Sequence, residues 1–285
     1  MDSTNKFMLL NNNSVIAITG AASGIGRALA KRAAERGVAG VAIADVNESG
    51  LNETADIVRQ AGGKVSVHVV DVSNFDQVQQ FADEVVAEHG KVTHIVNNAG
   101  VGVMGTFEQL SIADIEWLMG INYWGVVYGC KAFLAKFREQ GSGHIINISS
   151  VFGLIAPEEQ SAYCSSKFAV RGFTESLKHE LAGSGIDVSC VHPGGILTEI
   201  ARNSRLGQDT PAEWKAQGAK FFDKVAKTSP DTAADVIIDG INSGEVRILI
   251  GKDAKAMNLI VRLFPRKYLR VLEKLSGHKL SLRKK

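Results

Sequence analysis

The sequence is poor in features that mark secreted, metal-binding or membrane-spanning proteins. Its 285 residues include only 5 prolines and 3 cysteines, and the cysteines lack the CxxC spacing of a zinc site or a disulfide framework. No apolar stretch reaches the roughly 18 residues of a spanning helix. The apolar run near the N-terminus is four residues long, too short for a signal peptide. We therefore expect a protein of the reducing cytoplasm that holds no metal ion.

The chain also lacks a strong excess of either charge. Lysine and arginine number 32 against 30 acidic residues, a net charge of +2, so binding of nucleic acid by the whole chain is not expected. The distribution is uneven, because residues 252–285 hold eleven basic residues and two acids, which leaves −7 on residues 1–251. With 45% hydrophobic and 22% charged residues, the composition is typical of a soluble globular protein.

Short β-branched runs alternate with longer amphipathic segments along most of the chain. The short runs are almost continuously apolar, as expected of strands covered on both faces. The alternation predicts an α/β fold, with a doubly wound, mostly parallel seven-stranded sheet and helices on both faces. We expect residues 1–251 to form one domain and residues 252–285 an extension. The predicted strands are 14–19, 41–45, 65–70, 94–97, 144–149, 187–192 and 246–250. The predicted helices are 24–37, 48–61, 74–89, 111–138, 161–184 and 231–243.

A glycine-rich turn joins the first predicted strand to the first predicted helix. It runs from Thr19 to Gly26 and contains three glycines. Glycine lets the backbone turn sharply and approach a pyrophosphate closely, and the helix N-terminus offers free N–H groups. Asp45 ends the next predicted strand, where a carboxylate can accept hydrogen bonds from ribose hydroxyl groups. Together these features predict a dinucleotide site.

Asp45 also bears on the choice between NAD and NADP. A carboxylate here repels the 2′-phosphate of NADP, and no arginine or lysine lies in the glycine turn or directly after Asp45 to bind it. NAD is therefore the expected cofactor. Arg27 and Arg36 in the first predicted helix leave an NADP-dependent carbonyl reductase open as an alternative. A second alternative is that Asp45 only caps the end of its strand.

Tyr163 and Lys167 are four residues apart in a predicted helix, so they share one helix face. Of the four tyrosines, Tyr163 alone has a lysine at this offset. A free phenol has a pKa of about 10, and a nearby ammonium lowers that pKa because it favours the phenolate. Tyr163 is then a candidate to exchange a proton with a carbonyl or alcohol oxygen. An ordinary pair on the helix surface is the alternative.

Several short motifs together resemble those of the classical short-chain dehydrogenases/reductases, a family of Rossmann-type enzymes. The motifs follow the family's order and spacing over residues 14–251. The resemblance implies direct hydride transfer between a nicotinamide cofactor and a secondary alcohol or ketone, without a metal ion. A non-catalytic dinucleotide sensor on the same fold is the alternative. The motifs are Thr19-Gly20-(x)3-Gly24-Ile25-Gly26, Asn97-Asn98-Ala99-Gly100, Asn122, Ser149-Ser150, Tyr163-(x)3-Lys167 and Pro193-Gly194.

The resemblance implies four catalytic residues. Tyr163 would be the general acid/base, and Lys167 would lower its pKa and bind the nicotinamide ribose. Ser150 would orient the substrate oxygen. We choose it over Ser149 because it precedes Tyr163 by the family's thirteen residues. Asn122 would hold a water molecule near the lysine and so complete a proton relay.

The resemblance also assigns the cofactor contacts. The glycine turn would hold the pyrophosphate, Asp45 the adenosine ribose, and Asp71 with Val72 the adenine ring. Residues 97–100 would stabilise the sheet and border the adenosine ribose, and the loop after Pro193 would face the nicotinamide. The full expected set is Gly20, Ser23, Gly24, Ile25, Gly26, Asp45, Asp71, Val72, Asn98, Ala99, Gly100, Tyr163, Lys167, Pro193, Gly194, Ile196 and Thr198.

Apolar side chains such as Val103, Met104 and Leu154 dominate the loops expected to surround the substrate, at the carboxyl ends of the strands. They favour an apolar alcohol or ketone as the substrate. Residues 199–228 form a longer segment that includes large apolar side chains such as Ile200 and Trp214, and we expect this segment to close over the substrate as a lid. The family resemblance also implies a homodimer or homotetramer.

The C-terminal residues 255–285 interleave apolar and basic side chains on either side of Pro265. This pattern predicts two short amphipathic helices. A basic amphipathic helix can lie on an anionic membrane, which would make the protein peripheral to that membrane. The alternative is that the apolar side packs on the domain or on a partner subunit, with the lysines in solvent.

Overall fold

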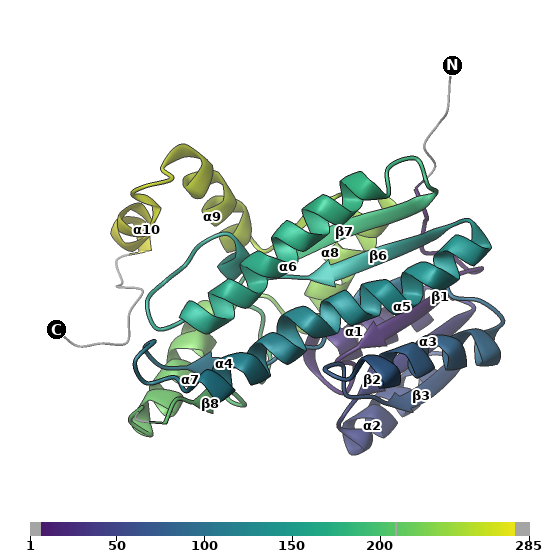
Figure 1. Cartoon of the computed structure of the whole chain (residues 1–285), viewed down its shortest axis with the longest axis horizontal. Coiled ribbons are helices and arrows are strands. Elements are labelled where there is room, and N and C mark those ends of the chain that lie inside the picture. The colour runs from purple at the N-terminus through teal and green to yellow at the C-terminus, as the bar shows by residue number, and fades with distance from the viewer. Residues whose placement is uncertain (1–6, 209, 277–285) are drawn as a thin grey trace.

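The computed structural model describes residues 7–208 and 210–276, which contain a seven-stranded parallel sheet flanked by helices (Figure 1). The strand order is β3-β2-β1-β4-β6-β7-β9. The chain order reverses between β1 and β4, and in such sheets ligands bind outside the carboxyl ends of the strands at this point. The predicted doubly wound fold is confirmed. The strands are β1 (Val15–Thr19), β2 (Gly40–Asp45), β3 (Val65–Val69), β4 (His94–Asn97), β6 (Gly143–Ile148), β7 (Ile186–Pro193) and β9 (Arg247–Ile250).

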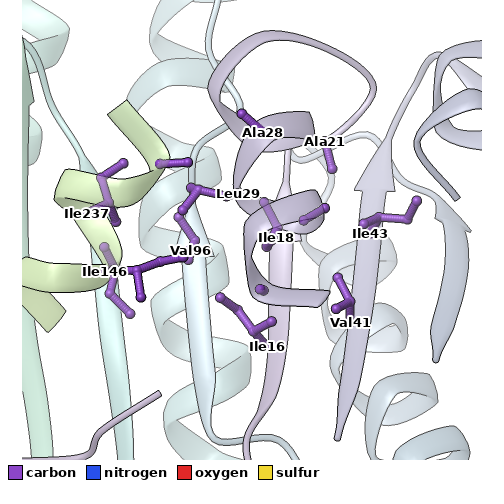
Figure 2. Packing of buried hydrophobic residues seen from close by; sticks show 14 of the residues in the cluster. Ile16, Ile18, Ala21, Ala28, Leu29, Val41, Ile43, Val96, Ile146 and Ile237 are labelled. Carbon is purple, nitrogen blue, oxygen red and sulfur yellow. The ribbon is translucent and has the colours of Figure 1, made fainter. Parts of the chain in front are cut away.

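Helices cover both faces of the sheet, and the strands are apolar on both sides for that reason. Within β1, Ile16 and Ile18 pack on the first face, whereas Val15 and Ala17 pack on the second. Figure 2 shows Leu29 and Ile237 from two helices of the first face beside the strand residues. The helices of the first face are α1 (Gly24–Glu35), α2 (Glu48–Gln60) and α8 (Pro230–Asn242). Those of the second face are α3 (Phe75–His89), α5 (Gly125–Gln140) and α6 (Ser161–Glu180).

Local sequence signals fix where several helices begin and end. Asn74 caps α3 by accepting hydrogen bonds from the N–H groups of Asp76 and Gln77, and Gly90 ends this helix with a φ of 77°. At α8, Ser229 caps the first turn and Pro230 fills the first helical position, where no N–H is needed. Such caps place the helix ends, and hence the loops that carry the site.

The predicted continuous helix 111–138 is wrong, because a π-helix interrupts it. The segment consists of α4 (Ile112–Met119), the π-helix η1 (Gly120–Trp124) and α5. The N–H of Gly125 donates to the carbonyl of Gly120, five residues back instead of four. The sequence pattern does not predict the interruption, because it depends on a contact between separate segments. Asn122, which lies in the π-helix, binds the backbone of the loop after β4. Insertions of this kind often occur at functional sites.

The segment 199–228 is tied to the body by a short sheet that the sequence did not predict. β5 (Val103–Met104) pairs in parallel with β8 (Arg205–Leu206). The guanidinium of Arg205 lies 3.4 Å from the centroid of the Trp117 ring, a cation–π contact. Helix α7 (Glu213–Val225) starts soon after Pro211. Residue 209 lies outside the described residues.

Two further helices follow the last strand, as the interleaved C-terminal pattern predicted. They are α9 (Lys252–Leu263) and α10 (Tyr268–Ser276), separated near Pro265. Figure 1 shows them beyond the end of the sheet toward which the β6 arrow points. Residues 277–285, which complete the expected basic extension, lie outside the described residues. Within the described part, α9 packs against β9 and against the short 3-10 helix η2 (Val151–Gly153).

Candidate active site

The glycine turn is packed directly against the loop that follows β4. A side-chain carbon at Gly20, whose φ is +66°, would lie 2.7 Å from Ala99 Cα. One at Gly26 would lie 2.3 Å from the Gly20 carbonyl oxygen. Asn98 completes the contact, since its Nδ2 donates to the carbonyls of Thr19 and Gly20 at 2.9 and 3.1 Å. These predicted residues therefore form one rigid unit, which only glycine permits at two positions.

Asn97, next to Asn98, points into the sheet instead. Its Nδ2 donates to Asn147 Oδ1 at 2.8 Å, and the two residues are paired across β4 and β6. Both are buried. This fits the sheet-stabilising part of the expected role of residues 97–100, while Asn98, Ala99 and Gly100 face the turn and its surroundings.

The start of α1 has no side-chain cap of its own. Ser23 occupies the N-cap position without a side-chain hydrogen bond, and the first turn contains no acidic residue. By contrast, α2, α3, α4 and α8 are capped by a side chain, whereas α6, α7 and α9 share the absence of a cap but do not follow a glycine turn at the carboxyl end of β1. The positive end of α1 is therefore left for an anion, as in a pyrophosphate site. Beside it lies Thr198, whose Cγ2 would be 3.2 Å from a side-chain carbon at Gly24.

Asp45 sits at the end of β2, within reach of the glycine turn. Its Oδ2 accepts a hydrogen bond from the Ala22 N–H at 3.1 Å, and its Oδ1 accepts one from the Asn47 N–H at 3.0 Å. Asp45 thus does cap its strand end, but each carboxylate oxygen can accept a second hydrogen bond. Asp71 follows β3, and its Oδ1 accepts from the backbone and hydroxyl of Ser73.

The two arginines that favoured NADP both form ion pairs, but Arg27 stays at the glycine turn, where its Nη2 donates to the Ala22 carbonyl at 2.5 Å. Arg27 pairs with Glu53 at 2.8 Å and donates to Thr54 Oγ1 at 3.0 Å. Arg36 pairs with Asp239 at 3.0 Å, on the far side of α1 from the turn. Neither guanidinium is directed at Asp45, which leaves the negative charge of that carboxylate to select the cofactor.

Ser150, Tyr163 and Lys167 come together from β6 and α6. The Ser150 hydroxyl hydrogen-bonds the Tyr163 phenol, and Lys167 Nζ lies 5.8 Å from the centroid of the Tyr163 ring. Ser149 points elsewhere, since its hydroxyl donates to the Lys167 carbonyl at 2.8 Å. The structure therefore groups Ser150, and not Ser149, with the tyrosine. A side-chain carbon at Gly100 would lie 3.5 Å from Lys167 Nζ, so this group borders the loop after β4.

The pKa of Tyr163 moves in the opposite direction from the expected one. Burial raises the pKa of Tyr163 to about 12, and the hydrogen bond from Ser150 lowers it only in part. Burial also lowers the pKa of Lys167 to about 8. The Lys167 ammonium donates to the Ile148 carbonyl at 3.0 Å, so its charge is not held against the phenol oxygen. In the protein without ligand, desolvation therefore outweighs the attraction between the two groups.

The Asn122 side chain forms hydrogen bonds with the backbone of the loop after β4. Its Oδ1 accepts from the Val101 N–H at 2.8 Å, while Nδ2 donates to the Val101 carbonyl at 3.0 Å and to Ser166 Oγ at 3.2 Å. The side chain is fully buried. A side-chain carbon at Gly100 would lie 3.4 Å from Asn122 Oδ1 and 3.5 Å from Lys167 Nζ, and Oδ1 can accept a second hydrogen bond, so the water relay stays a prediction. Asn122 also fixes the loop after β4 relative to the π-helix.

The loop from Pro193 to Thr198 is held from two sides. Gly195 O accepts from the Lys227 and Thr228 N–H groups, and Ile196 forms a bridge with Thr228. On the other side, the Gly195 N–H donates to Asp253 Oδ2 at 2.8 Å. Sequence reasoning missed Asp253. The available signal was an acidic residue in the first turn of a helix that starts directly after the last strand.

Two findings concern the described residues as a whole. None of the helices within residues 7–208 and 210–276 combines the length and apolarity that crossing a bilayer requires. In the same residues, no group of three histidine, cysteine or acidic side chains is arranged to hold a metal ion.

Comparison with known proteins identifies the class to which this fold and site belong. The family model described as short chain dehydrogenase matches residues 14–209. The chain is an oxidoreductase of the short-chain dehydrogenase family, as predicted. It is 43% identical over 261 residues to the Mycobacterium tuberculosis protein named oxidoreductase SadH, covering 90% of this chain and 93% of the relative.

A further relative and a solved structure agree with this class. The D-threitol dehydrogenase of Mycolicibacterium smegmatis is 36% identical over 244 residues, which cover 80% of this chain and 92% of that enzyme. The crystal structure of a short-chain dehydrogenase/reductase from Burkholderia phymatum in complex with NAD superposes with a TM-score of 0.79 at 31% identity. That match covers 96% of this chain and 98% of the other.

Proposed function

We propose that this protein transfers a hydride between NAD and an apolar secondary alcohol or ketone, with Tyr163 as the acid/base. The observation that carries the proposal is the junction of the Ser150 hydroxyl, the Tyr163 phenol and Lys167 at the carboxyl end of the sheet. A hydroxyl, a phenol and an amine at one point can handle the proton on a substrate oxygen, without metal chemistry.

The residues around the glycine turn fit a dinucleotide. The uncapped end of α1 suits the pyrophosphate, with Gly20, Ser23, Gly24, Ile25 and Gly26 as its cradle. Asp45 retains acceptor capacity for the ribose, and Asp71 with Val72 is assigned to the adenine. Asn98, Ala99 and Gly100 border the ribose side. Pro193, Gly194, Ile196 and Thr198 are assigned to the nicotinamide side, and the contact of Thr198 with Gly24 supports this.

NAD is proposed over NADP for two reasons. Arg27 and Arg36 are engaged in ion pairs with Glu53 and Asp239, and the Asp45 carboxylate is assigned to the ribose, where it would repel a 2′-phosphate. The Burkholderia phymatum relative, which is similar along almost its full length, was solved with NAD. Fluorescence titration with NADH and NADPH tests this choice, and tighter binding of NADPH would reverse it.

The chain's own groups manage the proton while the bound nicotinamide supplies or accepts the hydride. The Ser150 hydroxyl donates a hydrogen bond to the substrate oxygen and opposes the charge that develops there. Tyr163 gives its proton to a carbonyl oxygen, or removes one from an alcohol. Its pKa of about 12 in the ligand-free protein keeps it protonated, ready for the reductive direction. Oxidation requires a lower pKa of Tyr163, and a positive charge near the phenol would lower it.

The surroundings of Tyr163 support an apolar substrate. Its ring packs against a cluster that contains Val103, Leu110 and Leu118. The Phe152 ring meets it edge-on, with 6.1 Å between the ring centroids. An apolar wall of this kind favours a lipophilic ligand and leaves the hydroxyl and phenol as the polar groups that orient it.

Turnover of a panel of alcohols and ketones, followed by NADH absorbance, tests the proposed reaction. We expect apolar secondary alcohols to be preferred over polyols. If the protein binds NADH with high affinity but turns over no member of the panel, the non-catalytic sensor is favoured instead. The segment 199–228 is proposed as the lid, so removal of its β5–β8 anchor should raise the KM of the substrate more than that of NAD.

Further proposals concern the catalytic domain as a whole and the extension that follows it. Residues 1–251 form the catalytic domain of a cytoplasmic homodimer or homotetramer, which light scattering tests. Residues 252–285 form an extension that contacts an anionic membrane surface. The exposed apolar side chains of Leu259, Leu263 and Phe264 support this, since exposed basic residues flank them.

A further inference from the structure

Helix α9 begins against the loop that is assigned to the nicotinamide. Gly251 precedes the helix with a φ of +95°, and Asp253 lies in its first turn. The Asp253 carboxylate oxygen Oδ2 accepts a hydrogen bond from the Gly195 N–H at 2.8 Å. Because the acceptor is charged, this bond is stronger than one between neutral groups. It connects the C-terminal extension to the centre of the loop.

Two glycines leave the space that the Asp253 carboxylate occupies. A side-chain carbon at Gly194 would lie 2.2 to 2.5 Å from the Asp253 carboxyl group. One at Gly251 would lie 2.2 Å from Asp253 Oδ1. The two glycines therefore leave a slot that the carboxylate fills. Gly194 is also held from the sheet, because its N–H donates to the Ile250 carbonyl at 3.0 Å.

The extension meets a second loop of the site through α10. The Tyr268 hydroxyl accepts a hydrogen bond from the Ala156 N–H at 3.1 Å. Ala156 lies in the loop that follows Ser150 and η2. The two helices thus contact the loop on the nicotinamide side and the loop on the substrate side, with one side-chain hydrogen bond to each from Asp253 and Tyr268.

We propose that Asp253 is a positioning residue, which holds the loop from Pro193 to Thr198 in the conformation that binds the nicotinamide half of the cofactor. The inference rests on the proposed function, because that function assigns the loop to the cofactor. It goes further by giving the extension a role in cofactor binding that is separate from any membrane contact.

The first test follows the loop itself and needs no cofactor. In the full-length protein, D253A should speed hydrogen exchange in the peptides that cover residues 193–198, because the Gly195 N–H loses its acceptor. D253N should restore slow exchange, since an amide oxygen accepts the same hydrogen bond. Y268F is the matched control, as it removes one hydrogen bond of the same extension but should leave residues 193–198 unchanged. Equal exchange in D253A and the parent protein would overturn the proposal.

The second test measures the consequence for the cofactor. D253A should weaken NADH binding by about ten-fold, as expected for loss of one charge-assisted hydrogen bond, whereas Y268F should stay close to the parent. D253N keeps the hydrogen bond without its charge, so its loss should be smaller than that of D253A. The KM for NAD should rise with little change in kcat. If the parent protein binds no NADH, the proposed function fails, and the exchange test still judges the positioning role. Faster exchange in D253A with unchanged NADH affinity would overturn the link to the cofactor.

A double variant separates positioning from a direct effect of Gly194. G194A should weaken NADH binding because the added carbon displaces the Asp253 carboxylate. In the D253A background the same substitution has no carboxylate to displace, so it should add little further loss. Fully multiplicative losses in the double variant would mean that the two residues act independently, which contradicts the proposal.

Discussion

The glycine turn and the C-terminal extension are built in opposite ways, although both border the same end of the sheet. In the turn, side-chain carbons at Gly20 and Gly26 would each lie within 3 Å of backbone atoms and of the Asn98 side chain, and Ala21 and Ala22 between them are buried. In the extension, Leu259, Leu263 and Leu275 are 55%, 62% and 71% exposed. The difference teaches that close backbone packing fixes the glycine turn, whereas the extension is joined to the site by the packing of α9 on β9 and η2 and by the hydrogen bonds of Asp253 and Tyr268.

This contrast predicts different responses to substitution. Substitutions in the closely packed glycine turn and its surroundings should lower activity or stability, because the atoms there cannot move aside. Changes on the exposed face of the extension should cost neither, and should affect only what that face binds.

Tyr163→Phe should have the largest effect and should affect chemistry alone. The variant keeps the ring and its apolar contacts but loses the proton that is exchanged with the substrate oxygen. We expect kcat to fall by about 1,000-fold, within the range for general acid/base catalysis. The dissociation constant for NADH, measured by fluorescence titration, should change less than about two-fold. A variant that retains a tenth of the parent turnover would remove Tyr163 from the proposed role.

Gly26→Ala tests the rigidity of the turn. The added methyl would lie 2.3 Å from the Gly20 carbonyl oxygen, a backbone atom that cannot yield without moving the Asn98 contacts. We expect a loss of about 3 kcal/mol in the free energy of unfolding, measured with urea. Gly172→Ala is the matched control, since the exposed Gly172 in α6 has no atom within 4 Å of the new methyl. It should be neutral or stabilising by up to about 1 kcal/mol. Equal losses of unfolding free energy at both positions would contradict the proposed rigidity of the turn.

The buried Lys167 should make stability depend on pH. Its pKa falls from the ordinary 10.5 to about 8 in the folded protein, so between these values the unfolded chain binds more protons. The free energy of unfolding should therefore rise with pH across this interval, by about 2 kcal/mol from pH 7 to pH 10 relative to Lys167→Met. The comparison with the methionine variant removes the contributions of other groups, including Tyr163. Parallel pH profiles for the two proteins would show that Lys167 is not desolvated.

The double variant Leu259→Glu, Leu263→Glu should have almost no effect on stability. Both side chains are exposed, so the free energy of unfolding should change by less than about 0.5 kcal/mol. Flotation with phosphatidylglycerol vesicles should nevertheless be lost, whereas Val69→Glu, an exposed apolar residue on β3, should float like the parent. Flotation that is equal for all three proteins would end the membrane proposal, and a change in subunit number would point to a second copy of the chain instead.

The sequence predicted the fold well because its signals are local. The short apolar runs between the amphipathic segments predicted all seven strands of the large sheet to within two residues at either end. The glycine turn, Asp45 and the Tyr163–Lys167 pair were visible as motifs, since their spacing follows directly from the strand–turn–helix and helix geometry. The amphipathic pattern on either side of Pro265 likewise indicated two C-terminal helices.

The features that the sequence did not predict depend on contacts between distant segments. The π-helix forms where Asn122 binds the backbone of Val101, and the β5–β8 pair joins residues about a hundred positions apart. The pKa of Tyr163 was expected to fall because the lysine is near in sequence. It rises instead, because burial is a property of the whole fold.

The sequence by itself determined the family, the parallel sheet and the identity of the groups at the candidate site, because periodicity and short motifs are encoded in neighbouring residues. The tertiary structure decided the protonation of those groups and the placement of Asp253 against Gly195. Desolvation and contacts across nearly sixty residues arise only when the chain is folded, so no local pattern can record them.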